Sequence, residues 1–128
     1  MKEALHWLLD TLPVPVHAEG EVPQGTAGRY ITWQRLSDAS PHHLGGVDPQ
    51  REDTFSVQAF GNTEAETAWL GENIRDLLDG SSWTAEGEYV EKAVVENMLD
   101  DTELPPFGGG ERPQFRTVLT VRAWWQPA

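Results

Sequence analysis

The sequence predicts an α+β fold in which two helices pack on one face of a mainly antiparallel sheet of about four strands. Three observations lead to this prediction: apolar residues at helical spacing near the start, a helix-capping motif at mid-chain, and alternating apolar and polar residues near the end. The expected order is helix, strand, strand, helix, strand, strand, with long loops between the paired strands. The 128 residues suit a single domain, 1–128, and show no internal repeat.

The first helix is expected over Lys2–Leu12, where leucines recur at spacings of three and four residues. Pro13 ends it, because proline cannot continue a helix. The stretch Val14–Gly28 holds three glycines and two prolines. It is therefore expected to be an extended connection, with room for a short edge strand at Val14–His17.

Two strands joined by a long loop are expected next. Arg29–Leu36 is rich in β-branched and aromatic residues, which favour strands. Asp53–Gly61 alternates apolar with polar residues, as a half-buried strand does. Between them, Ser37–Glu52 is rich in turn residues and is expected to be a loop. Loops of about 15 residues are uncommon in a compact domain and are usually functional or disordered.

The second helix is expected over Glu64–Asp79. Thr63 and Glu66 have the spacing of a capping box, in which each side chain accepts a hydrogen bond from the other residue's backbone amide. Gly80 follows the helix, where a residue in the left-handed conformation commonly ends one.

The C-terminal part is expected to hold two strands around a second long loop. Tyr89–Met98 is rich in valine, although its pattern leaves the register open. Asp100–Pro113 is acidic and then rich in proline and glycine, which indicates a loop. Gln114–Trp125 alternates cleanly and gives the strongest strand signal. The expected core residues are apolar and face inward: Leu5, Leu8, Val57, Trp69, Leu77, Leu119 and Val121.

The composition excludes several functions. The chain has 9 Lys and Arg against 21 Asp and Glu, a net charge of -12. This balance argues against gripping nucleic acid phosphates, but it would let a polyanion slide past. No cysteine is present, so a disulfide, a thiolate metal site and a cysteine nucleophile are excluded. Because no apolar run suits a signal peptide or a membrane span, we expect a protein kept in a cytoplasm, with no membrane partner.

No motif places catalytic groups together. His42 and His43, with Asp38 and Asp48 nearby, are residue types that bind metals. Adjacent histidines on a loop do not readily face one ion, however, and no third spaced ligand supports them. The serines lack the setting of a nucleophile elbow, and Gly108–Gly110 lacks the Lys-Ser/Thr of a phosphate-binding loop. We therefore expect no enzyme activity, no cofactor and no metal.

Trp124 and Trp125 stand at the end of the last expected strand. Neighbouring side chains on a strand point to opposite faces, so both cannot enter the same core. One of them is expected to be exposed or to meet a partner, which favours a protein that works through contacts between subunits.

Four segments together resemble the tail completion, or tail terminator, family of long-tailed bacteriophages and prophages. They are Arg29–Leu36, Arg51–Phe60, Ile74–Gly80 and Phe115–Trp124. With the N-terminal helix they span nearly the whole chain. The shared pattern is one of hydrophobic strands with an Arg/Asp-Thr start to the second strand, and it contains no catalytic signature.

The resemblance implies a structural virion protein of the tail or neck, assembled in the cytoplasm of a bacterial host. In that family six copies form a ring on the head-proximal end of the tail tube, end its polymerisation and dock to the head connector, while DNA passes through the lumen. The implied partners are further copies of the chain, the tail tube protein and a head completion or connector protein. The candidate residues for intersubunit or lumen contacts are His42, His43, Asp48, Arg51 and Trp124.

Other interpretations stay open at this point. The loop Ser37–Glu52 is equally well explained as a plain surface loop. Another phage neck or adaptor protein would share the size and class of a tail terminator. A small acidic monomeric binding module, such as an inhibitor or immunity-type protein, fits the composition equally well, and a minor hydrolase is the weakest alternative. The mass in solution, alone and with the tail tube protein, would separate a ring from the monomeric alternatives.

Overall fold

The computed structural model of the chain describes residues 1–18, 28–39, 42–43, 46–47, 50–104 and 114–128. Within them the chain forms two helices and eight strands. Their bounds, in chain order, are α1 (Lys2–Leu9), β1 (Val16–Ala18), β2 (Tyr30–Ala39), β3 (His42–His43), β4 (Gly46–Val47), β5 (Arg51–Gly61), α2 (Glu64–Leu78), β6 (Trp83–Ala85), β7 (Glu88–Leu104) and β8 (Gln114–Pro127).

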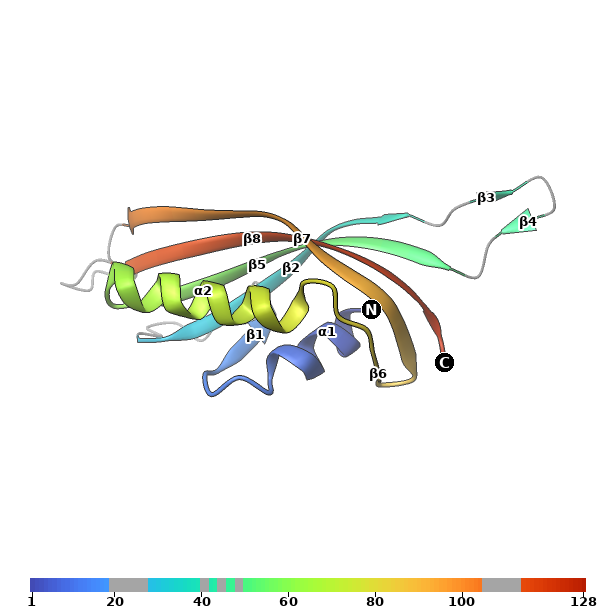
Figure 1. Cartoon of the computed structure of the whole chain (residues 1–128), viewed down its shortest axis with the longest axis horizontal. Helices are drawn as coiled ribbons and strands as arrows, with labels where there is room; N and C mark the ends of the chain where they lie inside the picture. The colour runs from blue at the N-terminus through green and yellow to red at the C-terminus, as the bar shows by residue number, and fades with distance from the viewer. Residues whose placement is uncertain (19–27, 40–41, 44–45, 48–49, 105–113) are drawn as a thin grey trace.

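Six strands form one curled, mixed sheet with the order β1-β2-β5-β8-β7-β6. Strand β1 runs parallel to β2, and every other neighbouring pair in this sheet is antiparallel. The short strands β3 and β4 pair only with each other. Both helices lie on one face of the six-stranded sheet, which leaves the opposite face without a helix among the described residues (Figure 1).

The predicted fold class is therefore wrong in its sheet. The expected sheet of about four strands is a six-stranded mixed one, and the expected order omits β1, β3, β4 and β6. Of these, β1 overlaps the segment Val14–His17, for which the sequence left room for a short edge strand. These strands have only two or three residues each, which is too short for an alternating pattern to be recognised. The turn-rich sequence around them indicates loop instead.

Strand β7 is also much longer than predicted, because it continues through acidic residues that indicate a loop. Asp100 and Asp101 lie opposite Thr117 and Arg116 of β8. The Thr117 hydroxyl donates a hydrogen bond of 2.8 Å to Asp100 Oδ1. A polar partner on the neighbouring strand thus lets a carboxylate stay in the sheet, and such a partner is invisible in a single segment.

The core lies between the sheet and α2. In β5 and β8 alternate side chains are fully buried, while those between them are only partly buried. Predicted core positions that are fully buried are Leu5, Val57, Leu119 and Val121. Leu8 and Leu77 are partly buried.

Trp69 is 49% exposed, so its predicted place in the core is wrong. The buried stripe of α2 runs through Leu70, Ile74 and Leu78, one position away, because residues four apart share a helix face.

The ends of α2 lie where the sequence predicts, although only one of the two hydrogen bonds of the expected capping box is formed. At the start, the Glu66 amide donates a hydrogen bond of 3.1 Å to Thr63 Oγ1. The Glu66 carboxylate lies 3.4 Å from Arg29 Nε. At the end, Gly80 has a φ of +75°, which suits the expected left-handed residue. The Gly80 amide then donates to the Ala93 carbonyl at 2.7 Å, which joins the end of the helix to the edge of β7.

Helix α2 approaches the sheet most closely at Gly71. A Cβ atom placed on this glycine would lie 2.7 Å from Cγ2 of Thr117 in β8, which is closer than real contacts allow. Glycine therefore stands here because the helix backbone lies directly on a β-branched side chain of the sheet.

Candidate assembly surfaces

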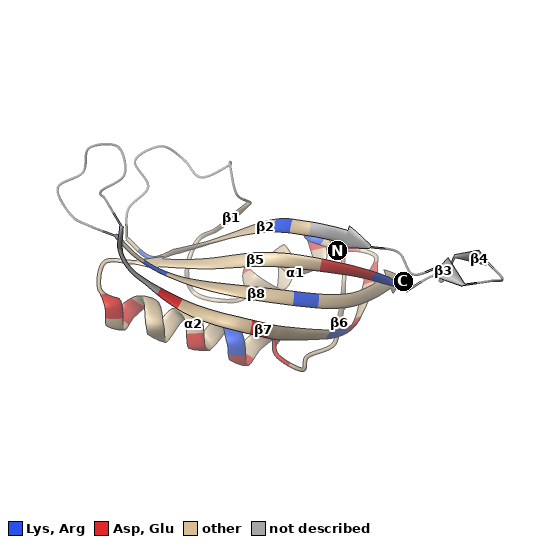
Figure 2. Ribbon diagram, turned by 90° about the horizontal axis from the view of Figure 1, so that it is seen from above, with Lys and Arg blue, Asp and Glu red and all other residues tan. Residues whose placement is uncertain are grey.

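The helix-free face of the sheet is formed by the four long strands β2, β5, β8 and β7, which run side by side across it (Figure 2). Its side chains are those of the partly buried positions that alternate with the core. On β5 they include Thr54, Ser56 and Gln58, and on β8 Val118 and Thr120. This face is mixed in polarity and, among the described residues, has no helix packed against it.

Charged side chains on the helix-free face are paired with one another. Arg122 Nε lies 3.3 Å from a carboxylate oxygen of Glu52 and 2.8 Å from one of Glu96. These pairs cross from β8 to its two neighbours. Nearer the other end of β8, Arg116 donates to Gln58 at 3.4 Å. The two arginines of β8 are thus held by groups of the same face, which limits their attraction for phosphates.

Two of the sequence-predicted contact residues lie near one end of the sheet but on opposite faces: Trp124 is on the helix-free face, and Arg51 is on the core side beside Trp125. The guanidinium carbon of Arg51 lies 5.8 Å from the ring centroid of Trp125, at cation–π distance. Trp125 packs against the hydrophobic core, whereas Trp124 lies opposite Glu52 and Lys92 and is partly exposed. Trp124 also lines a shallow cavity of about 360 Å³.

The other predicted contact residues are elsewhere. His42 and His43 form β3, which pairs with β4 and lies beyond the end of the six-stranded sheet (Figure 1). Asp48 lies outside the described residues. Among the residues that are described, no group of three His, Cys, Asp or Glu side chains is placed to hold a metal ion. No described helix is both long and apolar enough to cross a membrane.

The long strands at the two sides of the sheet each have a stretch without a strand partner among the described residues. Strand β1 pairs with Ile31–Trp33, so residues 34–39 of β2 have no strand partner on their outer side among the residues that the structure describes. Strand β6 pairs with residues 88–90 of β7, and the end of α2 meets residues 93 and 95. Beyond that point, residues 96–104 of β7 are open.

Each open stretch carries a large exposed apolar side chain. Leu36 of β2 is 54% exposed and Leu99 of β7 is 60% exposed. Natural proteins usually protect a free strand edge with a charge, a proline or a covering element, because it can pair with another chain. The open stretch of β7 contains such charges at Glu96, Asp100, Asp101 and Glu103, and β2 has a register shift at Leu36. Leu36 and Leu99 are therefore exposed apolar side chains on edges that are otherwise partly protected, and the sequence alone does not show which leucines lie at edges.

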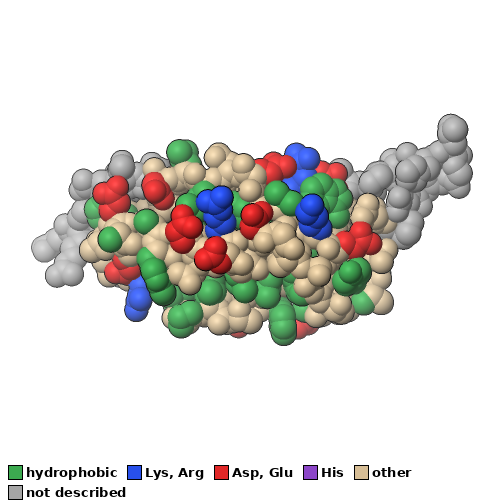
Figure 3. Space-filling model, in the orientation of Figure 1, with side chains coloured by type: hydrophobic (Ala, Val, Ile, Leu, Met, Phe, Trp, Pro, Cys, Tyr) green, Lys and Arg blue, Asp and Glu red, His purple; other side chains and the backbone are tan. Residues whose placement is uncertain are grey.

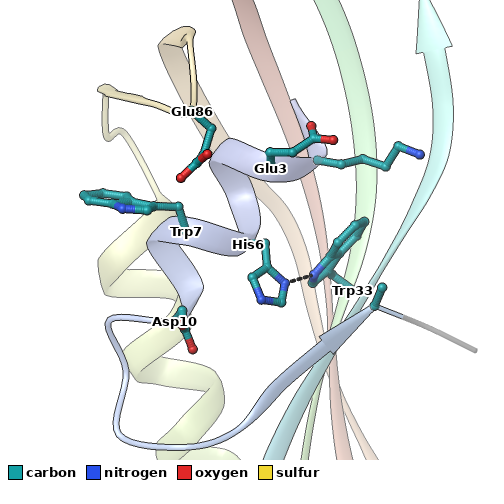
Figure 4. Close-up of a pocket in the computed structure, with 8 residues that line it drawn as sticks. Glu3, His6, Trp7, Asp10, Trp33 and Glu86 are labelled. Atoms are coloured by element: carbon teal, nitrogen blue, oxygen red, sulfur yellow. Dashed lines mark hydrogen bonds between the residues drawn. The ribbon is translucent and has the colours of Figure 1, made fainter. Parts of the chain in front are cut away.

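A pocket of about 490 Å³ lies beside α1 (Figure 4). His6 and Trp7 project from α1, Trp33 comes from β2, and Glu86 comes from the turn between β6 and β7. The Trp33 indole donates a hydrogen bond of 2.9 Å to His6 Nδ1. Sequence reasoning missed this site, because nothing in the sequence shows that His6, Trp33 and Glu86 come to the same place.

The outward side of α2 is acidic. Glu64, Glu72 and Asp76 are exposed there, and Figure 3 shows acidic side chains gathered over this helix. Trp69 also lies exposed on α2.

The fold is shared with a solved structure. One of 19 matching chains belongs to a structure described as the virion of a native gene transfer agent (GTA) particle. That chain has a TM-score of 0.65 and 17% sequence identity to this one, and the match covers 95% of this chain and 84% of the other. At this identity the match shows a common fold. No family model matches the chain, and no curated protein matches it.

Proposed function

We propose that the chain is a structural protein of a phage-like virion, a tail terminator that forms a ring on the head-proximal end of the tail tube and joins it to the head connector. The observation that carries this proposal is the fold shared with a chain from a gene transfer agent virion, over 95% of this chain. The proposal that the chain forms a ring, and that this ring lies at the head-proximal end of the tail tube, comes from the resemblance of the strands to those of tail terminators. The role requires no catalytic group, cofactor or metal.

The two open edges support a head-to-tail ring. They lie on opposite sides of the same sheet, one on β2 and one on β7, so a single copy offers two different and complementary surfaces. A contact between unlike surfaces repeats from copy to copy and closes into a ring when its rotation permits.

The strand directions also suit this contact. Each long strand is antiparallel to the next in the order β2, β5, β8 and β7, so β2 and β7 run in opposite directions. When a second copy is rotated to continue the sheet, its β7 runs antiparallel to β2 of the first. Antiparallel pairing needs no crossover and satisfies the open backbone groups of both edges.

The positions of the two edges predict how far neighbouring copies are shifted. Arg35 lies level with Val121 of β8, whereas Leu99 lies level with Val118, three positions along that strand. Leu36 follows Arg35 in the opposite direction, so the two leucines are about four positions apart. If Leu36 lies beside Leu99 of a neighbouring copy, that copy is displaced by about 13 Å along the strand direction. The four long strands of one copy span about 19 Å across the strands. This stagger tilts the strands by about 35° from the ring axis, close to the 35–45° typical of closed barrels.

Cysteine cross-linking tests the contact, because the chain has no cysteine of its own. The variant with Leu36→Cys and Leu99→Cys should form a ladder of disulfide-linked oligomers when it is oxidised on assembled particles. Each single substitution alone should give no ladder. A matched control that combines Leu36→Cys with Trp69→Cys should also give none, because Trp69 lies on α2. A ladder with the control but not with the edge pair would contradict the proposed ring contact.

The tail role has its own test. Cells that produce the particle without this chain should yield heads and tails that stay separate in electron micrographs. Free subunits can stay monomeric until they meet the tube, so the oligomer is best measured by native mass spectrometry with the tail tube protein added. Joined particles at normal yield without the chain would contradict the role. A ring at another position in the neck would instead assign the chain to the adaptor proteins.

A further inference from the structure

The pocket beside α1 combines aromatic rings with carboxylates. Trp7 and Trp33 supply the indoles, and the carboxylates belong to Glu3 in the first turn of α1, Asp10 at its C-terminal end, and Glu86. Figure 4 shows Glu3 and Glu86 toward one end of the helix and Asp10 toward the other. The lining therefore contains three carboxylates and one lysine, Lys2.

The Trp33 ring, which is only 9% exposed, is held in place before any ligand arrives. The Trp33 indole N–H is already bonded to His6 at 2.9 Å, and the two rings meet edge to face at 6.0 Å between centroids. On the inward side, Trp33 meets Phe55 at 6.2 Å, also edge to face. Trp7, by contrast, is 47% exposed, so one wall of the pocket is fixed and the other is open to a partner.

The Glu86 carboxylate reaches the pocket through an uncommon backbone conformation. Glu86 has a φ of +52°, and Gly87, which follows it, has a φ of +75°. Two successive left-handed residues form the tight turn that joins the antiparallel strands β6 and β7. A glutamate is an unusual residue to hold this conformation, and here its side chain joins the pocket lining.

Carboxylates around indole rings select for a cation, and they repel phosphates and other anions. A guanidinium group suits this lining best, because it stacks flat on an aromatic ring while its N–H groups bond carboxylates at its edge. The volume of about 490 Å³ lies within the range of ligand sites and leaves room for a long side chain entering from outside. The net charge of -12 adds a general attraction for a basic partner.

We propose that this pocket receives an arginine side chain from a basic segment of another protein. The occupant is a segment of another protein that is rich in Lys and Arg, because this chain has only 9 such residues against 21 Asp and Glu. This inference states what kind of partner a virion protein with this pocket would bind. It does not depend on ring formation, so the pocket hypothesis and the ring hypothesis can be refuted independently.

Nuclear magnetic resonance of the ¹⁵N-labelled full chain tests the proposal. The indole N–H signals of Trp7 and Trp33 are assigned with the variants Trp7→Phe and Trp33→Phe. The probe is acetyl-Gly-Arg-Gly-amide, titrated to about 10 mM because exposed charge pairs are weak. The matched probe replaces arginine with citrulline, which has nearly the same shape but no charge.

We expect the arginine peptide to shift the Trp7 and Trp33 signals in a saturable way, and sodium chloride to weaken the effect. Combining Glu3→Gln, Asp10→Asn and Glu86→Gln should weaken binding about tenfold or more. The control variant Glu64→Gln, Glu72→Gln and Asp76→Asn removes the same charge from α2 and should bind nearly as well as the unaltered chain. The proposal is overturned if neither indole responds, if citrulline acts equally, or if both triple variants lose binding to the same extent.

Discussion

The two faces of the sheet differ in packing although they share the same strands. On the helix-covered face, Phe55, Val57, Leu119 and Val121 are fully buried against α1 and α2. On the opposite face, side chains from the same strands are partly exposed and include the ion pairs of Arg122. Alternate residues along one strand therefore differ in role. Those on the helix-covered face stabilise the fold, and those on the opposite face are accessible to partners.

Substitutions at neighbouring positions of β8 should separate the two roles most clearly. Leu119→Ala should lower the free energy of unfolding by about 2–5 kcal/mol, because it removes fully buried atoms and leaves a cavity. Thr120→Ala, one residue along on the other face, should change it by less than about 0.5 kcal/mol. Denaturant melts of both variants measure the contrast. A loss below about 1 kcal/mol for Leu119→Ala would show that the covered face is not the source of stability.

The contact between α2 and β8 predicts the next largest effect. Gly71→Ala should cost about 1–3 kcal/mol, because the new Cβ would meet Thr117 Cγ2. Thr117→Ser removes that methyl group and keeps the hydroxyl bonded to Asp100. In the Thr117→Ser background, Gly71→Ala should therefore lower the free energy of unfolding by clearly less. The higher helix propensity of alanine offsets part of the loss that remains. Equal costs in both backgrounds would contradict the close approach as the cause.

Local signals predicted much of the covered face. Thr63 and Gly80 locate the two ends of α2 to within one residue, because capping depends on a few adjacent residues. Alternation likewise located β5 and β8. The prediction of the sheet was wrong where strands are short or acidic: β6 has only three residues and pairs with residues 88–90 of β7, and β7 continues through acidic residues. Trp69 was misplaced because its apolar character outweighed its position beside the buried stripe.

The contact surfaces were predictable only in part. Trp124 lies on the helix-free face, but nothing in its segment indicates that residues 96–104 of β7 lack a strand partner among the described residues or that Leu99 is exposed there. The pocket beside α1 brings together residues of α1, Trp33 and Glu86, and only the folded chain places them side by side. Sites of this kind depend on topology, which local patterns do not determine.

Ion pairs on the helix-free face should contribute little to stability. Arg122→Gln should lower the free energy of unfolding by at most about 1 kcal/mol, because Arg122 and its partners are partly exposed. The loss should shrink in about 1 M salt, where charges are screened. Glu96→Gln in the same variant should recover part of it by relieving repulsion between the two carboxylates. A loss above about 2 kcal/mol would place these pairs among the main sources of stability.

The open edge of β7 should show the smallest effect on stability together with a large effect on assembly. Leu99→Glu should leave the free energy of unfolding within about 0.5 kcal/mol, because Leu99 is 60% exposed. A charge on a free edge opposes pairing with another strand, so the yield of rings should fall at least about tenfold. Tyr89→Glu is the matched control: it is exposed on the same strand, where β6 already covers the edge. If Tyr89→Glu reduced the yield of rings as much as Leu99→Glu, the added negative charge and not the loss of strand pairing would explain the result. The free edge of β7 would then have no special part in assembly.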